Sequence, residues 1–287
     1  MREDANLVMG VAAGGAAAAA RTTDEPVIVL DRVSLAFDET VVLREISFTL
    51  SPGRTKIILG ASGSGKSTIL KLLLGFLKPD AGRIWVNGQR IDEMREHDLR
   101  AVRAGMGMVF QEGALFDSLS VAENVGYRLY EETGMPAADV RRRVEEVLGF
   151  IGLAEHVDKM PSELSGGQRR RVAIARAMAA KPGIMLYDEA TTGLDPITAL
   201  TVDEEIIKLR DAERVTSIVV THQLRDAFYV ATHEAVRHGD EVRITPADEQ
   251  KADETEFIML RDGVVGFEGN ASELRASLDL YLKTFLS

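Results

Sequence analysis

The chain has 287 residues, a hydrophobic fraction of 45 % and a formal net charge of −11 at pH 7. The length allows one large domain or two small ones, and the acidic balance argues against nucleic acid as a partner, which would need a basic surface on the protein. The sequence contains no cysteine, which excludes a disulfide framework and a thiolate metal site.

Residues 1–25 are expected to form a disordered tail. Residues 7–20 read LVMGVAAGGAAAAA, and the MRED before them carries two acids and one arginine. A signal peptide needs a positively charged flank, so this alternative is not favoured. Since no stretch of about 18 residues is strongly apolar, no membrane-spanning segment is expected. These features predict a cytoplasmic protein.

Strands dominate the next part of the chain. PVIVLDRVSLAF and VVLREISFTL alternate apolar and polar residues and predict two antiparallel strands. Residues 56–59 form a short apolar run that is typical of a strand buried on both faces. STILKLLLGFL has helical spacing and meets a stop signal at residues 78–82. Asn87-Gly88 predicts a hairpin turn.

Residues 112–180 change character and predict a helical subdomain inserted into an α/β core. Their helical stretches are SVAENVGYRLYEE, AADVRRRVEEVLGFIGL and GGQRRRVAIARAMAA. Buried strands follow at IMLYD (residues 184–188) and SIVVTH (residues 217–222), and LRDAFYVATH predicts a helix.

The C-terminal part begins with an acidic stretch at residues 234–256. It carries eight Asp or Glu residues against three Arg or Lys residues, which predicts a solvated loop or hairpin. FIMLRDGVVGFEG returns to strands. Residues 271–287 are expected to form a helical tail with an apolar face, because SELRASLDLYLKTFLS has helical spacing.

A phosphate-binding loop is predicted where the short apolar strand meets the first helix. Residues 60–67 fit G-x-x-x-x-G-K-[ST], in the strand-loop-helix context that this motif requires. Lys66 would reach the β- and γ-phosphates of a nucleotide, Ser67 would bind Mg²⁺, and Thr68 would contact the α-phosphate. The residues expected to hold the nucleotide are Gly60, Ala61, Ser62, Gly63, Ser64, Gly65, Lys66, Ser67 and Thr68.

Two further strands end in residues that suit phosphate chemistry. Asp188 lies at the carboxyl end of IMLYD, where ligands bind in open α/β sheets, and is expected to bind Mg²⁺. Glu189 follows, points differently, and is expected to act as the general base for water. His222 ends the next strand and is expected to contact the γ-phosphate.

A second glycine-rich helix start, LSGGQ at residues 164–168, predicts a second anion site. Three arginines follow it, and we interpret them as the exposed face of a helix rather than as a nucleic-acid surface. The apolar face of that helix would be Val172, Ile174, Ala175 and Met178. Either both anion sites serve one nucleotide, or the second serves the nucleotide of a neighbouring chain.

LSGGQ, together with GASGSGKS, IMLYDE and His222, resembles the ATPase subunit of ABC transporters over about residues 27–270. The resemblance implies a P-loop NTPase fold with a RecA-like α/β core, an antiparallel β subdomain and the inserted helical subdomain, all within residues 26–270. It also implies head-to-tail homodimers that hold two ATP molecules, with Mg²⁺, between the phosphate loop of one chain and the LSGGQ of the other. The residues that LSGGQ would contribute are Ser165, Gly166, Gly167 and Gln168.

Three more positions match the family. Phe37 lies where an aromatic ring stacks on adenine, although a core phenylalanine is the alternative. Gln111, in MVFQE, matches the glutamine that binds Mg²⁺ and senses the attacking water. Asp195, in GLDP, matches the key acid of the loop that crosses the dimer interface.

GALFDSLSVAENVGYRL and DEATTGLDPITA look most like the ATPases of lipid-trafficking systems that work with Mce-domain proteins. This implies movement of phospholipid or another lipid between bacterial membranes, on the cytoplasmic face of the inner membrane. The implied partners are a membrane permease, gripped around residues 116–127, and an Mce-domain lipid-binding protein. Ordinary subdomain core is the alternative for residues 116–127.

Other functions stay open at this stage. They are a transporter for a different substrate, such as an amino acid, a lipoprotein-release system, a non-transport ABC ATPase and a small-molecule P-loop kinase. Long coiled coils, as in chromosome-organising relatives, do not fit, because Lys66 and Asp188 are only 122 residues apart (188 − 66). A small-molecule kinase would lack LSGGQ.

Overall fold

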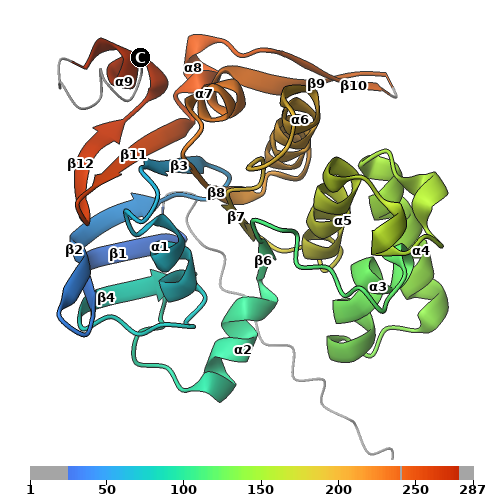
Figure 1. The fold of residues 1–287 in the computed structure, drawn as a ribbon, viewed down its shortest axis with the longest axis horizontal. Helices are drawn as coiled ribbons and strands as arrows, with labels where there is room; N and C mark the ends of the chain where they lie inside the picture. Colours follow the sequence, from blue (N-terminus) through green and yellow to red (C-terminus); the bar gives the residue numbers. More distant parts are fainter. Residues whose placement is uncertain (1–24, 240, 278–287) are drawn as a thin grey trace, which may run out of the picture.

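The structure, a computed structural model, describes residues 25–239 and 241–277. The described strands form three sheets, and Figure 1 shows a group of helices at one end of the longest axis of the molecule. The expected N-terminal tail and most of the expected C-terminal helical tail lie outside the described residues. Within the described part, no helix combines the length and the apolar composition needed to cross a bilayer.

The central sheet has six strands in the order β12-β11-β3-β8-β7-β6. Five of these strands are parallel and β12 is antiparallel to β11. Both β3 and β8 are buried along their whole length, as the short apolar runs predict. The strands are β3 (Thr55–Gly60), β6 (Met106–Val109), β7 (Ile184–Asp188), β8 (Thr216–Thr221), β11 (Thr255–Arg261) and β12 (Val264–Gly269).

Alternate residues of β3 face two separate hydrophobic cores. Ile58 packs with helix α1 (Lys66–Leu73) and with an antiparallel sheet, whereas Ile57 and Leu59 face the core that contains the helical subdomain. The antiparallel sheet has the order β2-β1-β4-β5 and confirms the expected β subdomain. Its strands are β1 (Ile28–Phe37), β2 (Thr40–Leu50), β4 (Ala81–Val86) and β5 (Gln89–Arg90).

The helical subdomain packs beside the other face of the central sheet (Figure 1). Helix α3 (Val121–Glu132) begins at a capping box, in which Ser120 and Glu123 bond each other's backbone N–H. Val125 of α3, Val144 of α4 (Ala137–Phe150) and Ile174 of α5 (Gly166–Met178) are completely or almost completely buried in one core. Two single turns, Ala154–His156 and Pro161–Glu163, connect α4 to α5.

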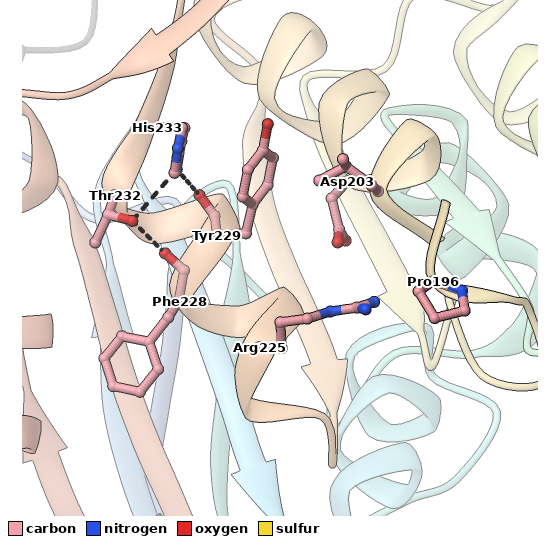
Figure 2. A pocket seen from close by; sticks show the side chains of 8 residues that line it. Pro196, Asp203, Arg225, Phe228, Tyr229, Thr232 and His233 are labelled. Carbon is pink, nitrogen blue, oxygen red and sulfur yellow. Dashed lines mark hydrogen bonds between the residues drawn. The ribbon is translucent and has the colours of Figure 1, made fainter. Parts of the chain in front are cut away.

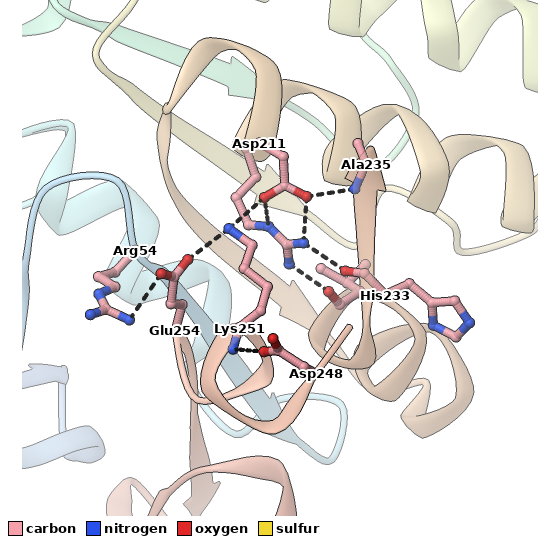
Figure 3. Close-up of polar contacts among 9 residues, drawn as sticks. Arg54, Asp211, His233, Ala235, Asp248, Lys251 and Glu254 are labelled. Carbon is pink, nitrogen blue, oxygen red and sulfur yellow. Dashed lines mark hydrogen bonds and ion pairs between the residues drawn. The ribbon is translucent and has the colours of Figure 1, made fainter. Parts of the chain in front are cut away.

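The acidic stretch is a hairpin followed by one short helix, so of the two expected forms the hairpin is present. Strands β9 (His233–His238) and β10 (Glu241–Pro246) pair with each other, and α8 (Glu249–Ala252) follows them. Figure 3 shows how Asp211 anchors this segment: it accepts from Ala235 N at 2.8 Å and lies 2.9 Å from Lys251 Nζ. Glu254 lies 2.7 Å from the same ammonium.

The remaining helices complete the core. Helix α6 (Pro196–Glu213) follows β7, α7 (Leu224–Thr232) follows β8, and α9 (Ala271–Ala276) follows β12. The predicted helix STILKLLLGFL extends beyond the end of α1. The chain leaves the helix at Leu74 and turns at Gly75, where φ is +65°. The prediction also missed α2 (Glu96–Ala104), β6 and α6.

Candidate functional site

Three neighbouring strands of the central sheet bring the expected catalytic residues together. Strand β3 leads into the glycine-rich loop, β7 ends at Asp188, and β8 ends one residue before His222. The register pairs Leu59 with Thr221 and Asp188 with Val220. Because all three strands are parallel, their carboxyl ends meet at one edge of the sheet.

Lys66 lies at the centre of this edge. Its side chain is 4 % exposed, and its Nζ donates to Gly60 O at 2.9 Å and to Ala61 O at 3.0 Å. The Oε1 atom of Glu189 lies 3.7 Å away. Burial lowers the pKa of Lys66, and Glu189 and Asp188 offset part of that effect. An ammonium group held by two backbone carbonyls inside a glycine loop is well placed to exchange them for phosphate oxygens.

The loop itself suits a polyphosphate. Gly65, the residue before α1, has a φ of +99°, and a Cβ there would lie 2.7 Å from Leu43 Cδ2. The first turn of α1 carries no acidic residue, so nothing opposes an anion at this helix N-terminus. The Ser64 hydroxyl is buried without a hydrogen-bond partner among the described residues. The Ser64 hydroxyl is therefore free to donate to a bound anion.

The Ser67 hydroxyl donates to Asp188 Oδ1 at 2.7 Å, which joins the two expected magnesium ligands. Burial raises the pKa of Asp188, and the hydrogen bond from Ser67 opposes this shift. No cluster of three or more potential metal ligands occurs in the described parts of the chain. A hydroxyl beside one carboxylate fits Mg²⁺, which keeps several waters and takes its other ligands from substrate phosphates.

Glu189 turns away from its neighbour because its backbone is left-handed, with φ at +49°. Its Oε2 accepts from Thr192 Oγ1 at 3.1 Å and lies 3.2 Å from His222 Nδ1. The Glu189 side chain is 14 % exposed and that of His222 is 43 % exposed, so the histidine forms the solvent side of the pair. The structure thus joins Lys66, Glu189 and His222 in one cluster.

The LSGGQ segment forms the N-terminus of α5. Ser165 Oγ accepts from Gln168 N at 3.3 Å, and Gln168 Oε1 accepts from Ser165 N at 2.9 Å, which completes a capping box. The segment packs on the start of α6, where Asp195 caps the helix by accepting from Ile197 N and Thr198 N, each at 3.1 Å.

Some expected site residues are not joined to this cluster. Figure 1 shows α1 beside the β subdomain and α5 with α3 and α4 on the other side of the molecule. Gln111 is exposed on the loop after β6, and no hydrogen bond links it to Ser67 or Asp188 within the described residues. Phe37 is 47 % exposed at the end of β1, so the alternative of a core phenylalanine is wrong.

Arg170 was expected on an exposed face, and this prediction is wrong. Its side chain is buried, and it donates to Phe110 O at 2.7 Å, next to Gln111, and to Thr192 O at 3.4 Å. Arg170 therefore ties the loop after β6 to the loop after Glu189. The sequence held a signal for this, since residue 170 falls four residues before Ile174 on the same buried stripe.

Replacement of Gly167 is expected to destabilise the LSGGQ segment. A Cβ at Gly167 would overlap Thr198 Cγ2, whereas one at Gly166 would lie 3.5 Å from Leu194 Cδ2. We expect Gly167→Ala to cost about 1–3 kcal/mol of unfolding free energy, and Gly166→Ala to be neutral or slightly stabilising, as measured by urea denaturation. Adding Thr198→Ser, which removes only the overlapping methyl, should restore most of the loss. An unaffected Gly167→Ala protein would contradict the packing described here.

Comparison with known proteins adds three kinds of similarity. Residues 43–192 match the family model described as "ABC transporter". The chain is 39 % identical over 221 residues to the methionine import ATP-binding protein MetN 1 of Rhodopseudomonas palustris, with 75 % of this chain and 59 % of that protein covered. It is also 39 % identical over 205 residues to the chloroplastic protein TRIGALACTOSYLDIACYLGLYCEROL 3 of Arabidopsis thaliana, with 66 % and 59 % covered.

Among solved structures, the chain is similar to a dimeric post-hydrolysis state of the ATP-binding cassette MJ0796 bound to ADP and Pi. The TM-score is 0.69 and the sequence identity 28 %, with 85 % of this chain and 98 % of that chain covered. The curated relatives are longer than the matched region, so the chain spans roughly three fifths of their length.

Proposed function

The chain belongs to the ABC transporter family, and from this premise we propose that it binds and hydrolyses ATP and passes the resulting motion to a membrane permease. The observation that carries the proposal is the cluster at the ends of β3, β7 and β8. There, Ser67 donates to Asp188, and the Glu189 carboxylate lies 3.7 Å from Lys66 Nζ and 3.2 Å from His222 Nδ1.

ATP is the substrate that this cluster suits, and the family uses it with Mg²⁺. Lys66 and the loop N–H groups would bind the β- and γ-phosphates, and Ser67 and Asp188 would hold the metal ion. Mg²⁺ supplies charge neutralisation on the phosphate oxygens when bound. Glu189 would accept a proton from the attacking water, and His222, which lies against Glu189 Oε2, would fix the γ-phosphate.

A second copy of the chain completes the proposed site. Ser165 and Gly167 lie at the N-terminus of α5, and Figure 1 shows α5 on the other side of the molecule from α1, which favours an anion site that serves a neighbour's nucleotide. The similar MJ0796 structure is described as a dimer bound to ADP and Pi, and it supports the same arrangement. Phe37, Gln111 and Asp195 keep their proposed roles at the adenine, the metal ion and the dimer interface.

The permease would dock on a groove of about 1020 Å³ between the helical subdomain and the core. Phe76, Phe110, Phe116 and Tyr127 line this groove, and their side chains are 39–55 % exposed. The rings of Phe116 and Tyr127 lie 4.7 Å apart and form one exposed aromatic surface, whereas Val121 and Val125 between them are buried in the subdomain core. Exposed aromatic patches of this kind mark interaction sites. We place the protein on the cytoplasmic face of the inner membrane.

The comparisons favour an amino acid, such as methionine, as the cargo of the transporter. The R. palustris relative and others carry the name of methionine import proteins. Lipid transport, which the sequence resemblance favoured, is the second candidate, because the Arabidopsis relative carries the name of a glycolipid. The Mce-domain partner belongs to this second candidate.

Transport by the reconstituted complex tests both candidates. The full chain, purified with the permease that co-purifies with it, is placed in proteoliposomes and given ATP and Mg²⁺. We expect ATP-dependent movement of labelled methionine, with none in the Glu189→Gln complex. Movement of labelled phospholipid alone would support the second candidate, and hydrolysis without movement of either would contradict both. If no permease co-purifies with the chain, the result favours a non-transport ABC ATPase.

A further inference from the structure

Two carboxyl groups are buried behind the candidate site. Asp203 of α6 and Asp226 of α7 are each 2 % exposed. They line a common void of about 10 Å³, together with Thr191 and Thr221. A void of this size holds about one water molecule. Two buried acids that share one small void are stable only if their oxygens find hydrogen-bond donors or one of the acids is protonated.

The hydrogen-bonding needs of the two acids are complementary. Asp226 Oδ1 accepts from Arg225 Nε at 2.9 Å and Nη2 at 2.8 Å, but Oδ2 is buried without a donor among the described residues. Burial and the charge of Asp226 raise the pKa of Asp203 to about 8, so Asp203 carries a proton at neutral pH. A protonated Asp203 has an O–H to donate, and Asp226 Oδ2 lacks a donor.

The location of the pair connects it to the site. Helix α6 begins at the Asp195 cap, and α7 begins two residues after His222. The Thr221 hydroxyl, which lines the void, accepts from Gln223 N at 3.0 Å. Ala190 and Thr191, the two residues after Glu189, also line the void. The void therefore lies between the start of the loop after β7 and the end of β8.

We propose that Asp203 and Asp226 are positioning residues for the proposed ATP hydrolysis, which join α6 to α7 through one shared proton, bridged by at most one water. The bond fixes the His222 end of β8 against the loops that carry Glu189 and Asp195. The expected effect on turnover rests on the proposed function, whereas the hydrogen bond between the two acids does not depend on it.

Other charged groups face the pair from each element around it. Figure 2 shows the Asp203 carboxyl and the Arg225 guanidinium pointing into the same pocket, which has a volume of about 290 Å³. Glu204 of α6 accepts from the Tyr229 hydroxyl at 3.5 Å, and the His233 ring stacks on Tyr229 with centroids 4.0 Å apart.

The proton on Asp203 also determines whether the stability of the folded protein rises or falls with pH. The pKa of Asp203 is about 8 in the folded protein against 3.8 for an ordinary aspartate. Between these values the native state holds a proton that the unfolded state has lost, so the contribution of this group to stability falls as pH rises, and it levels off above pH 8.

The test compares the full-length wild-type chain with Asp203→Asn, which keeps an N–H donor but cannot ionise, and Asp203→Leu, which has no donor. Between pH 7 and 9.5 we expect wild-type kcat to fall about fivefold relative to Asp203→Asn, with KM unchanged. Asp203→Leu should already have lost about fivefold in kcat at pH 7. The Tm of wild type should fall by about 5 °C relative to Asp203→Asn between pH 6 and 9.

Glu205→Gln is the matched control, because Glu205 is equally buried on α6 but pairs with Lys208 instead. It should retain the alkaline loss of kcat. If the kcat of wild type and of Asp203→Asn depends on pH in the same way, the proposal is overturned. It is also overturned if Glu205→Gln, like Asp203→Asn, shows no loss of kcat at alkaline pH. If the wild-type chain shows no ATP hydrolysis, the proposed function is wrong. The Asp203–Asp226 pair is then tested by stability alone, and a Tm difference between wild type and Asp203→Asn that stays constant from pH 6 to 9 would overturn it.

Discussion

Glu189→Gln is expected to lower kcat for ATP hydrolysis by about 10²–10⁴-fold while ATP still binds. The substitution keeps the size of the side chain and a carbonyl oxygen that can accept from Thr192 Oγ1, the partner that Glu189 Oε2 now has at 3.1 Å. It removes the negative charge that faces Lys66 and His222, and with it the ability to take a proton from water. Because binding persists and hydrolysis stops, the variant should accumulate as an ATP-bound dimer.

The measurement combines steady-state hydrolysis, nucleotide affinity by titration calorimetry, and the mass of the particle in solution with ATP and Mg²⁺. Glu249→Gln, an exposed acid in the first turn of α8, is the matched control and should behave as wild type. Wild-type turnover in Glu189→Gln would show that another group is the base. A variant that binds ATP yet remains a monomer would contradict the shared site.

Much of this site was predictable because its residues are adjacent to strong local patterns. Residues 60–68 follow a short, buried and mostly apolar strand, and Asp188 and His222 each terminate or follow another such strand. Parallel strands place their carboxyl ends at one edge, so the pattern alone predicted that Lys66, Asp188 and His222 would meet. The antiparallel β subdomain was predictable for a similar reason, since alternation marks a half-buried sheet.

Features that depend on contacts between distant segments were not predictable. Helix α6 buries Asp203, Glu205 and Arg210 beside its apolar residues, so its sequence lacks a clean apolar face, and the helix was missed. Arg170 looks like its two neighbours in sequence, and only the loops around it explain its burial. The void between Asp203 and Asp226 likewise appears only when α6 and α7 are packed together.

Ser165→Arg is expected to lower kcat for ATP hydrolysis by about 10²-fold or more, without weakening ATP binding to a single chain. Ser165 is exposed at the N-terminus of α5, where the proposal places the γ-phosphate bound by the neighbouring chain. An arginine there has a side chain too large for a closed interface. Since Ser165 contributes no bond to residues 60–68 of its own chain among the described contacts, the phosphate loop should bind nucleotide as before.

The substitution also removes a helix cap, which costs about 1 kcal/mol of stability, and this effect needs its own controls. Ser165→Ala removes the cap without adding bulk, and Asn270→Ala removes an equivalent capping box from α9, remote from LSGGQ in the sequence. Asn270→Ala should lower Tm by an amount comparable to Ser165→Ala and retain wild-type turnover. Only Ser165→Arg should prevent ATP-dependent dimerisation, as measured by light scattering on the Glu189→Gln background. A dimer that forms normally with arginine at this position would remove LSGGQ from the interface and, with it, the shared nucleotide.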